Sequence, residues 1–162
     1  WFDHVFKGAP LPALLKARVN HQVMGANLWK HADGLEAMAP RRLRLHLQAD
    51  GPVLALREPA PPAGRGALAT LRVDFGDRSD ADAPLPELRL SRDFRLRHAL
   101  GFRSAVLPEG SELSGLFSGR LVFSSNKRDL DFSVTLYEEL ASGEVFELAS
   151  WLQRASYARD RV

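Results

Sequence analysis

Apolar side chains recur at every second position in several separate stretches of this 162-residue chain. Successive side chains of a β-strand point to opposite faces of a sheet, so this spacing predicts half-buried strands and argues against helices. The clearest stretch alternates Leu43, Leu45 and Leu47 with charged or polar residues. The other stretches hold Leu54 and Leu56; Ala69, Leu71, Val73 and Phe75; Leu88 and Leu90; Phe94 and Leu96; Leu121 and Phe123; and Phe132, Val134 and Leu136. Short strands therefore dominate the predicted secondary structure.

Turn-forming segments separate these strands. Asp50-Gly51 and Ser142-Gly143 favour tight hairpins, because glycine adopts a positive φ without steric cost. A further turn is expected at 126–129, and long loops are expected at 58–66 and 76–86. With roughly eight or nine strands and turn signals about every 8–12 residues, the pattern predicts an all-β sandwich.

The first residues predict a short helix. Gly8 supplies the residue type that commonly follows a helix end, and a buried strand is then expected over 19–24. The apolar positions that share one helical face are Trp1, Phe2, Val5 and Phe6. The chain is therefore expected to enter its sandwich through a helix.

The two-residue period also predicts which side chains form the core. One apolar core is expected to contain Leu43, Leu45, Leu47, Leu71, Val73, Phe75, Leu121, Phe123, Phe132, Val134 and Leu136. The arginines on the opposite phase, Arg42, Arg44, Arg72 and Arg120, are expected to face solvent or a partner.

Composition excludes several classes of function. The chain has no cysteine, which rules out disulfides and thiolate metal sites, and no apolar run long enough to span a membrane. Its 22 basic and 20 acidic residues leave a net charge of only +2. Clustered arginines alternate with apolar residues, which is typical of the solvent face of strands and argues against nucleic-acid binding. They are Arg41, Arg42 and Arg44, and Arg89, Arg92, Arg95 and Arg97.

No complete catalytic or metal-binding set is present. Gly115 to Gly119 approaches the nucleophile-elbow pattern, but its serine is one position off and a glycine-broken β segment is favoured. A metal set could be assembled from His31, Asp33 and Glu36, although such a grouping often arises by chance. The five histidines, His4, His21, His31, His46 and His98, are otherwise scattered. We therefore predict no catalytic, cofactor-binding or metal-binding residues in the chain.

Two further groups allow alternative interpretations. Trp29, Trp151 and Tyr157 could form a sugar-stacking platform, although the apolar strand around Trp151 favours core packing for that residue. Asp129 and Asp131 could contact calcium or a substrate, but two carboxylates supply too few oxygens for calcium. Capping of backbone N–H groups in the turn is favoured for both.

Several segments, in this order and spacing, resemble the cocaine esterase / glutaryl-7-aminocephalosporanic acid acylase family of serine hydrolases. Their C-terminal region is similar to the X-Pro dipeptidyl-peptidase C-terminal domain. The segments are Trp1 to Gly8, Val23 to Trp29, Asp74 to Asp80, Glu112 to Gly115, Asn126 to Phe132, Leu136 to Glu138 and Arg154 to Arg159. The match is weakest at 52–68 and 83–103.

This resemblance implies a jelly-roll β-sandwich of galactose-binding-like type, preceded by a short helix left from an α/β-hydrolase domain. Residues 1–18 are expected to be the tail of that catalytic domain and 19–162 the jelly roll. Because family jelly rolls continue after the Arg154 to Arg159 segment, further strands are expected beyond this chain. Residues before Trp1 are also expected, because the chain does not begin with methionine.

The resemblance also implies where catalysis is absent. The family's serine, aspartate and histidine all lie in the hydrolase domain, and its histidine motif precedes the helix matched by residues 1–8. None of the five histidines therefore inherits that role, and His4 lies at a non-catalytic helix position. The parent is expected to hydrolyse an ester, a β-lactam side-chain amide or an X-Pro peptide.

The expected function is that of a non-catalytic domain that packs on its own catalytic domain and shapes the substrate cleft. The alternative is a free-standing carbohydrate-binding module. We expect no cofactor, metal, nucleic acid or membrane partner, and a homo-oligomer or strand exchange that covers the incomplete sandwich. A soluble protein of the bacterial cytoplasm or periplasm is expected, with the compartment left open.

Overall fold

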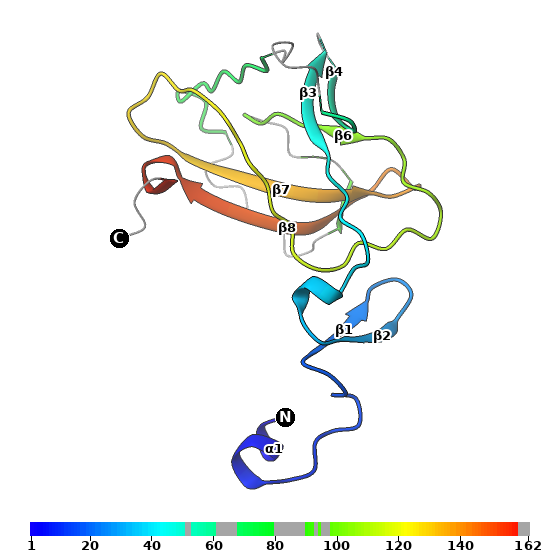
Figure 1. Cartoon of the computed structure of the whole chain (residues 1–162). Helices are drawn as coiled ribbons and strands as arrows, with labels where there is room; N and C mark the ends of the chain where they lie inside the picture. Colours follow the sequence, from blue (N-terminus) through cyan, green and yellow to red (C-terminus); the bar gives the residue numbers. More distant parts are fainter. Residues whose placement is uncertain (51–52, 61–67, 80–89, 93, 95–97, 159–162) are drawn as a thin grey trace. The chain divides into compact units, whose positions relative to one another are not determined.

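The computed structural model describes residues 1–50, 53–60, 68–79, 90–92, 94 and 98–158, and every structural statement concerns these residues (Figure 1). Strands predominate, and one short α-helix stands at the N-terminal end, which confirms the prediction of a mostly β chain. The elements are α1 (Phe2–Lys7), β1 (Val19–Val23), β2 (Leu28–Ala32), η1 (Leu35–Ala37), β3 (His46–Asp50), β4 (Val53–Arg57), β5 (Leu90–Ser91), β6 (Arg103–Ser104), β7 (Asp131–Glu139), β8 (Val145–Arg154) and η2 (Ala155–Ala158).

The strands form three small sheets. β1 pairs with β2, a second sheet has the order β3-β4-β6, and a third has the order β5-β8-β7. By internal contacts the chain divides into two compact units. The first comprises Trp1–His46, Arg57–Ala60 and Ser104–Leu121, and the second comprises Leu47–Leu56, Pro61–Arg103 and Val122–Val162.

Helix α1 ends where the sequence predicts. Gly8 follows it at φ 69°, and the N–H of Gly8 donates to the carbonyl of His4 at 3.2 Å. Lys7 forms an ion pair with Asp3 one turn earlier, at 2.6 Å. The apolar face is uncovered in the described structure: the rings of Phe2 and Phe6 stack on each other, and Phe6 remains 75% exposed.

The β1–β2 hairpin contains the strand predicted over 19–24, but the predicted burial is wrong, because β1 is half-buried or exposed and Met24 is 72% exposed. Its antiparallel register pairs Val19 with Ala32 and Val23 with Leu28. Positive φ angles at Gly25 (81°) and Asn27 (54°) reverse the chain. The hairpin therefore owes its turn to the residues that the sequence placed at the strand end.

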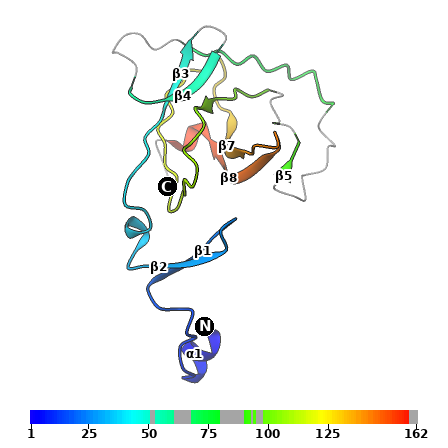
Figure 2. The same cartoon turned by 90° about the vertical axis from the view of Figure 1, so that its right-hand side faces the viewer.

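The β7–β8 hairpin is the longest paired element, and its strands lie side by side in Figures 1 and 2. Gly143, at φ 85°, forms the predicted turn. The register shifts once, between Leu136 and Tyr137, where Leu148 of β8 is the extra residue of a β-bulge. One face of the hairpin carries the pair Val134 and Trp151, and the other carries polar pairs, including Thr135 with Ser150.

The predicted single core is wrong. Buried apolar side chains in the described structure are Ala32, Ala55 and Val145, whereas Leu45, Phe132 and Leu136 are only half-buried. The remaining members of the predicted core, Leu43, Leu47, Leu71, Val73, Phe75, Leu121, Phe123 and Val134, are exposed. The alternation identifies the apolar phase of a strand, but burial also requires a second layer over that face. Residues 69–74 and 121–123 were expected to supply strands to it and lie in none.

Two other expectations have mixed outcomes. The strand predicted over 42–48 begins only at His46. The four arginines that were expected to face outward are exposed, as predicted: Arg42, Arg44, Arg72 and Arg120. Several predicted positions lie outside the described residues: Gly51, Leu88, Leu96, Arg89, Arg95, Arg97 and Arg159. Among the described helices, none combines the length and apolarity required to cross a bilayer.

Candidate functional site

The most connected polar cluster lies where the β7–β8 hairpin ends. We call Asp129, Asp131, Arg154 and Ser156 the hairpin clasp. Asp129 precedes β7 and η2 follows β8 directly, so the pairing of the two strands brings the four residues together. The Ala155 N–H extends the ladder by donating to the Leu130 carbonyl at 2.9 Å. The clasp therefore joins segments 27 residues apart through backbone and side-chain bonds.

Asp131 and Arg154 form the bidentate part of the clasp. Arg154 Nε donates to Asp131 Oδ1 at 2.8 Å, and Nη2 donates to Oδ2 at 3.1 Å. This hydrogen-bonded contact lowers the pKa of the Asp131 carboxyl and raises that of the guanidinium. The predicted backbone capping by Asp131 is thus wrong, because cross-strand register places an arginine directly opposite it.

Asp129 accepts backbone N–H groups, as predicted, although one of them lies at the start of η2 and outside the turn. Its Oδ2 accepts from the Ser156 hydroxyl at 2.9 Å, and its Oδ1 accepts from the N–H groups of Ser156 at 3.0 Å and Leu130 at 2.9 Å. These bonds, led by the Ser156 hydroxyl, lower the pKa of the Asp129 carboxyl. Its oxygens are therefore engaged in fixing the chain after β8.

The contacts of the hairpin clasp indicate a structural role and not a catalytic one. Both carboxylates are held ionised by these contacts. The charge of Arg154 is balanced by Asp131, and Arg154 Nε also lies 3.9 Å from Asp129 Oδ2. A general acid or base needs a pKa moved toward neutrality, and these carboxyl pKa values move the other way. The Arg154 guanidinium also lies 5.9 Å from the Tyr157 ring centre, which orients that exposed ring.

A second polar cluster joins β2 to the segment around Glu112. Lys30 Nζ donates to Glu112 Oε2 at 2.6 Å, and Ser114 Oγ donates to Oε1 at 2.7 Å. These two bonds lower the pKa of Glu112, the Lys30 bond having the larger effect. His21, the cross-strand partner of Lys30, has both ring nitrogens buried without a hydrogen-bond partner in the described structure. The sequence offered no signal for this ion pair, because its members are 82 residues apart.

The metal set weighed from the sequence, His31, Asp33 and Glu36, is not assembled. His31 Nδ1 contacts Asn20 Oδ1 at 2.7 Å, and Glu36 pairs with Arg42. Across the described ranges, no group of three or more histidine, aspartate or glutamate side chains is placed to hold a metal ion. His4 contacts the carbonyl of Ala9 at 2.7 Å, so it serves the end of α1.

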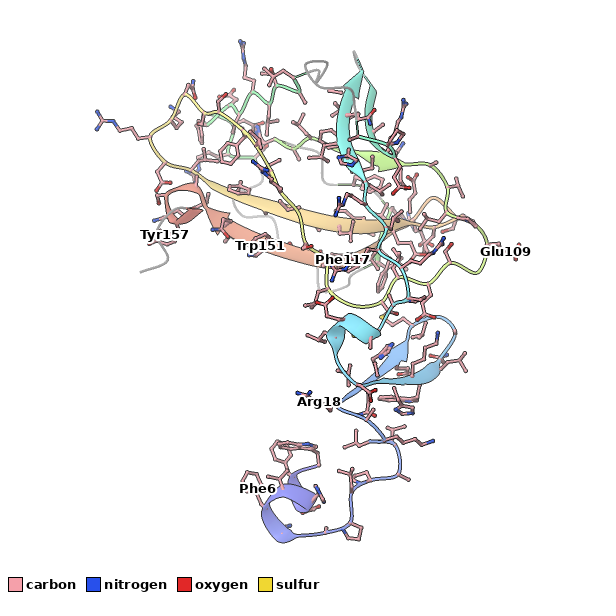
Figure 3. The ribbon with its side chains drawn as sticks, viewed as in Figure 1. Phe6, Arg18, Glu109, Phe117, Trp151 and Tyr157 are labelled. Carbon is pink, nitrogen blue, oxygen red and sulfur yellow. The ribbon has the colours of Figure 1, made fainter. Side chains whose placement is uncertain are left out.

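The aromatic candidates are all accessible. Trp151 is 56% exposed on β8, so the expectation that it packs in a core is wrong (Figure 3). Its cross-strand neighbour Val134 is also exposed, whereas Phe132, on the same face of β7, is half-buried against the ring of Phe123. Trp29 on β2 and Tyr157 on η2 are likewise exposed, but Trp29 belongs to the other compact unit.

The near-elbow segment has no catalytic geometry. Gly115 has φ 102°, and the following residues to Gly119 are irregular, without the strand-to-helix turn that the motif needs. An added Cβ at Gly115 would lie 3.9 Å from the Leu35 carbonyl, an ordinary contact, so the positive φ accounts for a glycine there.

Comparison of the chain with protein-family models, with curated proteins and with solved structures gave no match.

Proposed function

We propose that this chain is the non-catalytic C-terminal part of an α/β-hydrolase-type serine enzyme. In this proposal residues 19–162 form a jelly roll that packs on the enzyme's own catalytic domain and borders its substrate cleft. The parent reaction is acyl transfer to water: a serine attacks an ester or amide carbonyl, a histidine moves the proton, and backbone N–H groups hold the oxyanion. Those catalytic groups would all lie in the other domain.

The observation that carries the proposal is the uncovered face of α1. Trp1, Phe2, Val5 and Phe6 are all exposed, although they line one side of a capped helix. Isolated helices this short are marginal in water and take their stability from packing of the apolar face. A catalytic domain of the resembled family would supply the missing surface, and the chain's mostly β content agrees with the proposed jelly roll.

The first test is the reading frame that contains this chain. The proposal expects upstream sequence with a G-x-S-x-G nucleophile elbow and a later histidine. The 162-residue chain alone should hydrolyse aryl esters no faster than buffer. Serine-dependent turnover by the chain alone, or an upstream frame without a hydrolase domain, would contradict the proposal.

The second test uses the full-length enzyme. Replacing Phe2 and Phe6 by serine should lower its thermal midpoint and its activity together, because the apolar contact of α1 is lost. Lys7→Ala is the matched control, since Lys7 lies on the same helix and is largely exposed. Equal behaviour of the two variants would show that α1 does not dock.

One observation favours the alternative of a carbohydrate-binding module. Trp151 and Tyr157 expose aromatic rings on the same compact unit, and sugars stack on exposed rings. Titration with oligosaccharides should then quench tryptophan fluorescence in the wild type and in Trp29→Phe, but not in Trp151→Phe. Absence of quenching in the wild type removes this alternative.

A further inference from the structure

The outer edge of the nine-residue strand β7 carries backbone groups that have no hydrogen-bond partner in the described structure. β7 stands last in the order β5-β8-β7, and no backbone hydrogen bond joins its outer side to another described residue. Unpaired edges normally carry a lysine, a proline or an inward charge that prevents pairing. Residues 132–137 are Phe-Ser-Val-Thr-Leu-Tyr, and this segment contains no lysine, no proline and no charged residue.

The hydrogen bonds of the hairpin fix which groups point outward. Ala155 N–H donates to the Leu130 carbonyl at one end, and Leu140 N–H donates to the Glu144 carbonyl at the other, at 2.9 and 2.8 Å. In an antiparallel ladder, residues whose N–H and C=O groups bond to the partner strand alternate with residues whose N–H and C=O groups point away from it. Since Leu130 and Leu140 both bond toward the β8 side, the odd-numbered residues of β7 point their backbone groups to the outer edge. These residues are Asp131, Ser133, Thr135, Tyr137 and Glu139.

This outward set is symmetric about Thr135. A second copy of β7 running antiparallel, with a two-fold axis at Thr135, would match every outward residue with another outward residue. Thr135 would face Thr135 of the second copy, Ser133 would face its Tyr137, and Asp131 would face its Glu139. On the opposite face, Val134 would contact Leu136 of the second copy at the close spacing of non-hydrogen-bonded pairs. The half-exposed Val134 side chain would thereby be covered.

The charges at the two ends are compatible with this register. Asp131 and Glu139 are both acidic, but each already has an arginine: Arg154 binds Asp131 at 2.8 Å, and Arg103 Nε lies 3.2 Å from Glu139 Oε2. Each end of the paired strands would therefore bring together two carboxylates and two guanidiniums.

We propose that the β7 edge is a self-recognition surface that pairs antiparallel with β7 of a second copy, about a two-fold axis at Thr135. The pairing extends β5-β8-β7 into a continuous six-stranded sheet across two chains. Pairing along a single strand buries a small interface, so the dimer is expected to dissociate in the micromolar range. This inference stands apart from the proposed function, because it rests on β7 and makes no use of α1.

The test is sedimentation velocity of the 162-residue chain from roughly 5 to 200 μM, a range chosen for weak interfaces. Thr135→Pro removes the outward N–H at the axis without removing a β7–β8 ladder bond. Thr135→Ala is the matched control, since both variants lose the hydroxyl contact with Ser150 and only the proline loses the N–H. Wild type and Thr135→Ala should dimerise alike, and Thr135→Pro should dimerise about thirtyfold more weakly or not at all. A wild type that stays monomeric, or a proline variant that associates like wild type, overturns the proposal.

Amide hydrogen exchange of the wild type provides a measurement that does not depend on the proline variant folding. The N–H groups of Ser133, Thr135 and Tyr137 should be protected at high concentration and exchange freely at low concentration. Those of Val134 and Leu136, which point into the hairpin, should be protected at both. Equal exchange of the outward amides at the two concentrations, or protection that requires a different added protein, refutes self-pairing.

Discussion

Val145 offers the sharpest test of how the β5-β8-β7 sheet is held together. Its side chain is 1% exposed, and it lies between Ser91 of β5 and Glu139 of β7. Val145→Ala removes two buried methyl groups, about 0.8 kcal/mol each in transfer free energy. The cavity left behind raises the expected loss of unfolding free energy to about 2–3 kcal/mol.

The assay is urea unfolding followed by tryptophan fluorescence at low protein concentration. With a urea dependence of about 2 kcal/mol per M, the midpoint should fall by about 1 M. Val106→Ala is the matched control: the same substitution at a side chain that is 98% exposed should leave the midpoint unchanged. If the two variants lose similar stability, the burial assigned to Val145 is wrong and this reasoning fails.

The remaining predictions concern the hairpin clasp and the hairpin turn. Because the pKa values of Asp129 and Asp131 are lowered in the folded chain, their ionised forms add stability above the ordinary carboxyl pKa, and this stability is lost as the pH falls below about 4. Asp131→Asn should therefore show a smaller drop in urea midpoint between pH 6 and pH 3 than wild type, and an equal drop would remove Asp131 from the acid transition. Gly143→Ala should destabilise the chain by about 1 kcal/mol, since φ 85° strains any residue with a Cβ. Gly119→Ala, at a position without positive φ and with open space for a Cβ, should be neutral in the same thermal melt.

Local chemistry made part of this fold predictable. Gly8 ends α1, and Gly143 turns β7 into β8, because each relies on a backbone conformation that glycine adopts easily. The bond from the Leu130 N–H to Asp129 was likewise predictable, since a carboxylate beside a turn readily accepts nearby N–H groups, whereas the bond from Ser156, 27 residues away, was not. These features depend on a few neighbouring residues or on one strand pairing.

Long-range features were not predictable in the same way. Nothing in the sequence pattern relates Lys30 to Glu112, because their contact depends on how distant segments fold back. Trp151 has the apolar surroundings of a core residue, but a strand pattern does not reveal whether another layer covers its face. Asp131 was assigned to the backbone because its arginine partner lies 23 residues away.

The bulge at Leu148 gives the two strands of the β7–β8 hairpin different tolerance to changes in length. Ala149 and Glu147 already pair with the adjacent residues Leu136 and Tyr137, so deleting Leu148 would leave every cross-strand partner unchanged. Deleting one residue from within β7 instead would send Asp131 to the face opposite Arg154 and separate the clasp. Length variation among natural or engineered versions of this hairpin should therefore collect at Leu148, with β7 constant in length.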